Sequence, residues 1–114
     1  MRMWMVNPRG MCDKHLLGEH VEMHMFWGTI AKKKNVDGFI EKNLLEIRSL
    51  LRRHDALVRE MERRGMTHKT PIDSLPKGHK KIKRIRIPRE ETKEILLSRC
   101  NDCKNRHKLL GEVQ

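Results

Sequence analysis

Residues 41–65, EKNLLEIRSLLRRHDALVREMERRG, carry the clearest helical pattern in the sequence. Mostly apolar residues recur every three or four positions, as expected for the buried face of a helix. They are Leu44, Ile47, Leu51, His54, Leu57 or Val58, and Met61. This spacing places them on one side of an α-helix. Gly65 follows at a position where helices commonly end. We therefore expect a helix over about residues 41–64.

Two further helices are predicted on either side of this one. The first covers about residues 11–31 and follows Asn7-Pro8, whose proline suits a loop or a first helical turn. The other covers about residues 88–110 and has acidic residues in its opening turns, where the helix dipole favours negative charge. Residues 66–87 form a basic loop in this interpretation, because their strand-like segment KIKRIRI has no partner strand. The sequence thus predicts an all-α fold.

The length and composition indicate one compact domain with an unusual charge. A chain of 114 residues can close a modest core without disulfides or metals. We expect residues 1–114 to form a single domain of about three helices and long loops, with the N-terminal segment packed against the first helix. Lysine and arginine number 26 against 15 acidic residues, which gives a formal charge of +11. That excess is typical of nucleic-acid binding, and binding to acidic partners or anionic lipid is the alternative.

The same sequence argues against export and membrane insertion. No apolar run approaches the roughly 18 residues of a membrane span, and the N-terminus does not resemble a signal peptide. Three cysteines without a secretory signal indicate reduced thiols rather than a disulfide framework. We expect a cytoplasmic monomer, either nucleoid-associated or virus-encoded, that does not bind membranes.

The first ten residues, MRMWMVNPRG, are apolar from the third position on. Chain termini are usually poorly ordered unless something holds them. Here we predict that Met3, Trp4, Met5 and Val6 are buried. Their burial would hold the α-amine of Met1 against the folded body.

A polar stripe runs along the first predicted helix. Its members recur at spacings of three and four residues and so share a face: Cys12, His15, Glu19, Glu22 and Phe26. Apolar residues, among them Leu17 and Val21, cover most of the remaining surface, so this imidazole and these carboxylates need partners or a function. The alternative is a solvated face with helix-stabilising pairs such as His15 with Glu19.

Metal binding is weighed at two places in the sequence. His20 and His24 lie four residues apart, but a zinc protease needs its glutamate directly after the first histidine, which argues against that class. Cys100, Cys103 and His107, with Cys12 as a fourth, could also supply zinc ligands. Their spacing on one continuous helix fits a small apolar stripe equally well. We favour the stripe, and predict no metal and no cofactor.

Two stretches together resemble a known family. RMWMVNPRGMCDKHLLGEHVEMHMFWGTI, followed by RRHDALVREMERRG, is similar to the pyrimidine-dimer DNA glycosylases of the phage endonuclease V type, which are small all-α repair enzymes. The resemblance covers about residues 1–72. It places His15 and Glu22 at the histidine and catalytic glutamate of the family, and Arg2 at its N-terminal arginine. Met1 takes the place of the family's N-terminal nucleophile.

This resemblance implies a DNA repair glycosylase with abasic-site lyase activity on ultraviolet pyrimidine dimers or related damaged bases. The α-amine would form a Schiff base with the sugar, Glu22 would move protons during β-elimination, His15 would orient sugar or phosphate, and Arg2 would bind a phosphate. Independent chemistry agrees, because α-amines have a reference pKa of about 7.7–8.0 against about 10.4 for lysine, so far more of an α-amine is neutral near pH 7.5.

Basic clusters supply the predicted contacts with double-stranded DNA that contains damaged or abasic sites. They comprise Lys32, Lys33 and Lys34 after the first helix, Lys80, Lys81, Lys83, Arg84 and Arg86 in the loop, and Arg52, Arg53, Arg63 and Arg64 on the second helix. The chain departs from the phage enzyme at Val21 and Met25, where that enzyme has arginines, and it lacks the aromatic-rich C-terminus. A non-catalytic, basic DNA-binding protein on the same scaffold is the alternative.

Overall fold

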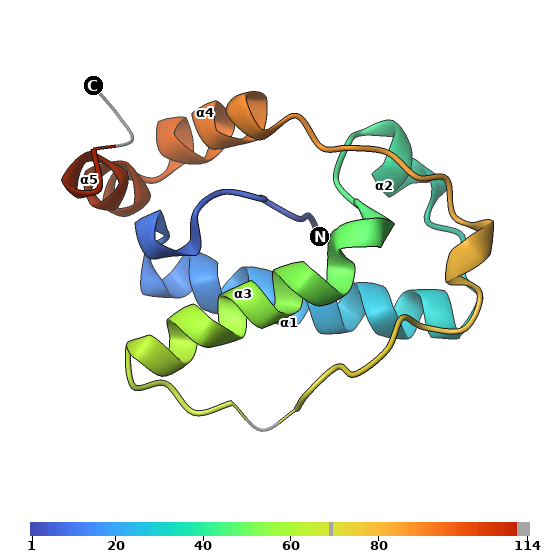
Figure 1. Ribbon diagram of the computed structural model, residues 1–114. Coiled ribbons are helices and arrows are strands. Elements are labelled where there is room, and N and C mark those ends of the chain that lie inside the picture. The colour runs from blue at the N-terminus through green and yellow to red at the C-terminus, as the bar shows by residue number, and fades with distance from the viewer. Residues whose placement is uncertain (69, 112–114) are drawn as a thin grey trace.

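Helices are the regular secondary structure of this protein in the computed structural model, which describes residues 1–68 and 70–111 (Figure 1). The α-helices are α1 (Asp13–Ala31), α2 (Asp37–Glu41), α3 (Leu50–Arg63), α4 (Arg89–Arg99) and α5 (Asn101–Leu109). Short 3-10 helices are η1 (Pro8–Gly10), η2 (Ile47–Ser49) and η3 (His79–Lys81). No strand occurs among these described residues, so the all-α prediction is confirmed. The prediction of about three helices was too low, since five α-helices are present in this part of the chain.

The helix predicted over residues 41–64 is shorter than expected, because α3 begins only at Leu50. Asn43 has a left-handed backbone with a φ of 58°, which a continuous helix does not allow. The carbonyl of Leu44 accepts a hydrogen bond of 2.8 Å from the amide of Met3, so it is taken by a segment far away in the sequence. The predicted end is confirmed: α3 stops at Arg63, and Gly65 follows with a φ of 82°.

The helix predicted over residues 88–110 is two helices. Cys100 has an extended backbone with φ −136° and ψ 109°, and it ends α4. Its side chain then accepts a hydrogen bond from the amide of Cys103 and so caps the start of α5. This break turns the chain, and α5 packs against η1 near the N-terminus.

The N-terminal segment crosses the middle of the molecule. Figure 1 shows it running over the paired helices α1 and α3 and ending near the centre of the view, with α4 on its other side. Met3, Trp4 and Val6 are buried, as predicted. Met5 is only half-buried and has a left-handed backbone with a φ of 56°, so its predicted burial was wrong in degree.

The apolar residues of α1 are more exposed, and its polar residues more buried, than the sequence pattern predicted. Leu17 and Val21 are 40% and 54% exposed, whereas Glu19 and His20 are buried. The inward face of α1 is therefore partly polar, with Glu19 bound to Arg53 and His20 beside His24. No helix in the described part of the chain is both long enough and apolar enough to span a membrane.

The loop over residues 66–87 wraps around the molecule and contains only η3 as regular structure among its described residues. In Figure 1 it leaves α3, passes the end of α1 that carries Ala31, and returns to α4. The indole nitrogen of Trp27 donates a hydrogen bond of 2.8 Å to the carbonyl of Ser74, which attaches the loop to α1. Its KIKRIRI segment forms no strand.

Candidate functional site

The N-terminus and Glu22 meet at the centre of the molecule. The backbone amide of Arg2 donates a hydrogen bond of 3.1 Å to Oε2 of Glu22, which lies on α1. Both residues are half-buried, and Met1 packs against the hydrophobic core. The structure thus brings Met1, Arg2 and Glu22 together. The Glu22 carboxylate is bonded to the residue that directly follows Met1, which carries the α-amine.

Arg2 is held above an aromatic ring. Its guanidinium carbon lies 3.8 Å from the centre of the Trp4 ring, a distance typical of a cation–π contact. Burial, followed by the charge of Arg99, lowers the pKa of Arg2. Its Nε atom is buried without a hydrogen-bond partner among the described residues. Arg99 comes from the end of α4, and nothing in the sequence pattern indicated that it lies near Arg2.

Glu19 has a structural partner. Its carboxylate accepts hydrogen bonds of 2.6 and 2.8 Å from the guanidinium of Arg53 on α3, and both side chains are buried. Arg53 also donates a hydrogen bond of 2.6 Å to the carbonyl of Val6. This buried pair therefore fixes the N-terminal segment, and it leaves neither side chain for contacts with a phosphate.

Two other arginines, at the end of α3 and directly after it, also have acidic partners. Arg63 and Arg64 both bind the carboxylate of Glu60, with nitrogen–oxygen distances of 2.8 and 2.7 Å. Arg64 further donates to the carbonyl of Met11 at 2.7 Å, beside η1. Of the four arginines predicted on this helix, only Arg52 is exposed and outside the ion pairs found among the described residues.

His15 lies beside sulfur atoms. Its Nδ1 is 3.2 Å from Sγ of Cys12 and 3.7 Å from Sγ of Cys103. Its ring stands edge-on to Trp4, with 6.1 Å between the ring centres. Trp4 thus contacts both His15 and Arg2, and the described contacts of His15 are with the cysteines and this tryptophan.

Cys12, His15, Cys100 and Cys103 form one group, in which all four possible ligand atoms lie within 4.8 Å of one another. The alternative set weighed from the sequence had His107 in place of His15, and the structure places His15 in this group instead. Nδ1 of His107 lies 2.9 Å from the carbonyl oxygen of Cys103, and its ring fills the space beside Gly10. Burial raises the pKa of Cys103 to about 12.

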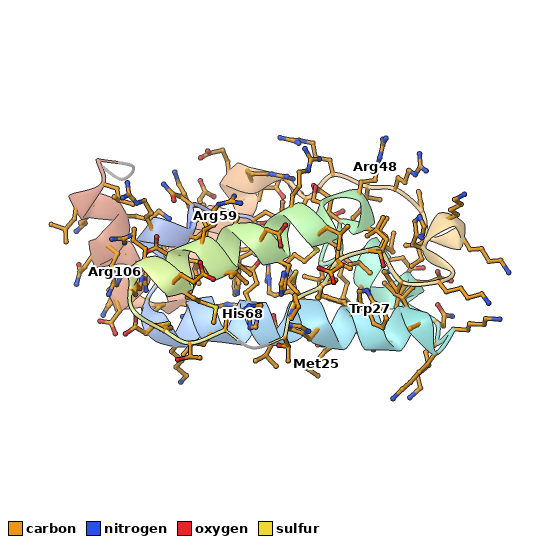
Figure 2. The ribbon with its side chains drawn as sticks, turned by 60° about the horizontal axis from the view of Figure 1, so that its bottom comes forward. Met25, Trp27, Arg48, Arg59, His68 and Arg106 are labelled. Carbon is orange, nitrogen blue, oxygen red and sulfur yellow. The ribbon has the colours of Figure 1, made fainter. Side chains whose placement is uncertain are left out.

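Four histidines form a second group: His20, His24, His54 and His68. They come from α1, α3 and the start of the loop, and Figure 2 shows His68 beside α1. Burial, followed by the neighbouring histidines, lowers the pKa of His20 to about 4, so its imidazole is neutral at physiological pH. From the sequence, only His20 and His24 on α1 were considered together as possible metal ligands. His54 had been assigned to the apolar face of its helix, and His68 had no pattern to identify it.

Part of the predicted basic clusters lines two hollows, whereas Lys32, Lys80 and Lys83 line neither of them. One of about 510 Å³ is lined by Glu46, Arg48, Ser49, Arg52, Arg84, Ile85 and Arg86. Figure 2 shows Arg48 at the edge of the molecule, among other nitrogen-tipped side chains. A second hollow of about 270 Å³ has Lys33 and Lys34 on one side and Lys81 on the other. Clusters that are separate in the sequence therefore converge, and Arg48 joins them without having been predicted.

Comparison with protein families gives a match to the N-terminal two thirds of the chain. The family model described as pyrimidine dimer DNA glycosylase matches residues 1–74. The chain belongs to this family. No curated protein and no solved structure gives a significant match.

Membership of the pyrimidine dimer DNA glycosylase family makes DNA the substrate and DNA repair the field of activity, and it confirms the resemblance drawn from the sequence. The matched residues include Met1, Arg2, Glu22 and the four histidines. They do not include the basic residues around η3, nor α4 and α5. The C-terminal third of this glycosylase therefore adds basic surface and two cysteines to the part that defines the family.

Proposed function

We propose that this glycosylase is bifunctional: it removes a damaged base through a Schiff base on the α-amine of Met1 and then cleaves the strand by β-elimination. The observation that carries the proposal is the hydrogen bond from the amide of Arg2 to Glu22. It puts a proton acceptor beside the chain terminus, which is the arrangement this chemistry needs.

In the first step the neutral amine attacks C1′ of the damaged nucleotide. The bond between C1′ and the base breaks, and the base leaves with that electron pair and gains a proton. The amine nitrogen gives up one proton, the bond between C1′ and O4′ breaks as O4′ takes up a proton, and a protonated imine between nitrogen and C1′ results. The Glu22 carboxylate stabilises positive charge that develops on the sugar and exchanges protons during ring opening.

In the second step Glu22 takes the acidified proton from C2′. The electrons form a C2′–C3′ double bond, and the C3′–oxygen bond breaks with the phosphate as leaving group. Water then hydrolyses the imine and releases the amine of Met1. Arg2, with Arg99 near it, binds a phosphate next to the reacting sugar.

Pyrimidine dimers and related damaged bases are the proposed substrates. The sugar of a stacked nucleotide is reached only when the duplex is opened locally, at a cost of a few kcal/mol that damage lowers. The basic hollows around Arg48 and Lys81 bind the phosphates that flank the lesion. His15 has no step in this mechanism, because its Nδ1 faces the cysteine sulfurs.

Borohydride trapping tests the proposal directly. The protein is incubated with a duplex that contains one abasic site, in the presence of sodium borohydride, which reduces an imine to a stable amine. We expect a covalent adduct whose peptide map places the sugar on Met1. A duplex with a tetrahydrofuran site, which cannot form an imine, is the matched control.

Absence of an adduct, with DNA binding intact, would favour the alternative, a basic DNA-binding protein without turnover. An adduct on a lysine would keep the glycosylase and lyase chemistry but remove Met1 from it.

A further inference from the structure

The group of three cysteines and one histidine has the dimensions of a zinc site. In a tetrahedral site with Zn–S of about 2.3 Å and Zn–N of about 2.0 Å, two sulfurs lie about 3.8 Å apart and sulfur and nitrogen about 3.5 Å apart. Here Sγ of Cys12 lies 3.8 Å from Sγ of Cys100, and Nδ1 of His15 lies 3.7 Å from Sγ of Cys103 and 3.2 Å from Sγ of Cys12.

The backbone around these side chains also fits metal binding. The ligands form two pairs, Cys12 with His15 and Cys100 with Cys103, each with two residues between its members. In each pair the first cysteine caps a helix and the second ligand lies in its first turn. Two complete pairs from separate elements are the usual construction of a structural zinc site.

Backbone amides point at the sulfur atoms. The amides of His15 and Cys103 lie 3.4 and 3.5 Å from the cysteine Sγ atoms that cap their helices, and the amide of Cys12 lies 3.3 Å from Sγ of Cys103. Amide donors stabilise the negative charge of thiolates, and thiolates are the form in which cysteines bind metal ions.

We propose that Cys12, His15, Cys100 and Cys103 bind one Zn²⁺ ion, which joins the start of α1 to the break between α4 and α5. Four protein ligands leave no open position, so the ion is structural and not part of the DNA chemistry. It attaches the C-terminal helices to the family-matched part of the chain. This site is independent of the proposed lyase activity.

Zinc release on thiol modification tests this site in the intact protein. The protein is saturated with zinc, freed of loosely bound metal, and titrated with an organomercurial in the presence of a chromogenic zinc indicator. We expect one equivalent of zinc to be released as the three thiols react, and Co²⁺ in place of zinc to give a thiolate charge-transfer band. Less than a tenth of an equivalent released, or a cobalt spectrum without that band, would overturn the proposal.

Substitutions then identify the ligands. His15→Ala should lose the thiol-linked equivalent, whereas His15→Cys, which supplies another sulfur ligand, should keep it. His107→Gln should keep it as well, because that side chain lies outside the group. Loss in the His107 variant with retention in His15→Ala would contradict the ligand set. If a variant does not fold, the zinc-release and cobalt measurements on the unmodified protein still test whether the group binds one zinc ion.

A different observation supports a second metal site. Nε2 of His24 lies 3.3 Å from Nε2 of His20 and 3.3 Å from Nε2 of His54, close to the separation of about 3.3 Å between imidazole nitrogens on a tetrahedral ion. Thr70 Oγ1 lies 3.4 Å from the same nitrogen. One ring nitrogen has a single proton or a single lone pair, so it cannot make a good hydrogen bond with all three neighbours.

The surroundings of the four histidines are those of metal ligands. Nε2 of His68 is buried without a hydrogen-bond partner among the described residues. Nδ1 of His54 lies 3.2 Å from a carboxylate oxygen of Asp55, and such a contact orients a ring whose other nitrogen binds metal. We infer that His20, His24, His54 and His68 bind one divalent transition-metal ion of the class that prefers imidazole, such as Zn²⁺ or Ni²⁺.

Metal titration of matched variants tests this second site. Zn²⁺ and Ni²⁺ are each added to the unmodified protein, to His24→Ala and to His79→Ala, whose histidine lies in η3 away from the group. We expect His24→Ala to bind one equivalent of Zn²⁺ fewer than the unmodified protein, and to lose binding of Ni²⁺. The thiol-linked zinc should stay, and His79→Ala should match the unmodified protein. Equal binding by His24→Ala and the unmodified protein would overturn this site.

Discussion

The amide of Arg2 and the carboxylate of Glu22 are joined by a hydrogen bond of 3.1 Å across 20 residues of sequence. A chain end thereby lies next to a side chain in the middle of a long helix.

Glu22→Gln should bind abasic DNA as the unmodified protein does but nick it about 10²-fold more slowly or worse, because an amide still accepts the bond from Arg2 but cannot take a proton. Single-turnover nicking assays measure the effect. Glu62→Gln, at an exposed glutamate of α3, is the control. Nicking by Glu22→Gln at the unmodified rate would remove Glu22 from the mechanism.

Blocking the α-amine should abolish imine trapping. Acetylation of Met1 converts the amine to an unreactive amide with little added bulk, and an uncleaved N-terminal tag does so with more. A C-terminal tag should leave trapping intact, and all three proteins should bind DNA. A reducible adduct on the acetylated protein would show that a lysine is the nucleophile.

Replacing Lys80, Lys81, Lys83 and Arg84 by alanine should flatten the salt dependence of DNA binding. Each phosphate contact contributes about 0.9 to the slope of log K against log salt, because bound counterions are released. Binding titrations between about 50 and 200 mM salt give the slope. Alanine at Lys104 and Lys108, exposed on α5, removes two charges outside the loop as a control, and a loop variant with the slope of the unmodified protein would place the DNA elsewhere.

Arg53→Ala should lower the free energy of unfolding by about 3–5 kcal/mol, because it leaves the Glu19 carboxylate buried without its partner. The same change frees the carbonyl of Val6, so imine trapping should weaken as well. Denaturant unfolding measures the first effect. Arg52→Ala, one residue away and exposed, should change stability by no more than about 0.5 kcal/mol.

Glu46 should make the fold sensitive to acid. Burial alone would raise the pKa of this carboxyl, but hydrogen bonds from Arg89, Ser49 and the amide of Ile87 lower it to about 2. A depressed pKa in the folded state stabilises the fold above the ordinary value of 4.5, and that contribution is lost as the pH falls toward 2. Between pH 5 and pH 2, the free energy of unfolding should therefore fall less steeply for Glu46→Gln than for the unmodified protein. Parallel curves would contradict this assignment.

The sequence pattern predicted the helices where neighbours along the chain decide the structure, and failed where distant residues do. The end of α3 at Gly65 depends on local backbone geometry and was predicted. Its start depends on the bond between Met3 and Leu44, which no local pattern contains. The break at Cys100 likewise lies within a group of side chains from both ends of the chain, which no local pattern contains.

The site shows the same division. Met1, Arg2 and Glu22 were predicted through a resemblance, which transfers a spatial arrangement that the sequence alone does not express, and the structure places them together. Spacing placed Glu19 on the correct helix face but could not reveal that Arg53 neutralises it. Helical periodicity relates a residue to its own helix, so partners on other elements, such as His68 for His20, stay invisible to it.

The path of the N-terminal segment has a consequence for the order in which the protein matures. Residues 1–12 are synthesised before Leu44, Arg53 and Cys103, each of which anchors them. At about 5–20 residues per second, the 91 residues from Cys12 to Cys103 take roughly 5–20 seconds to make. Leu44 and Arg53 become available part-way through that interval, and Cys103 becomes available only at its end. The N-terminal segment is therefore fully anchored only after α5 has been made and has folded back onto η1.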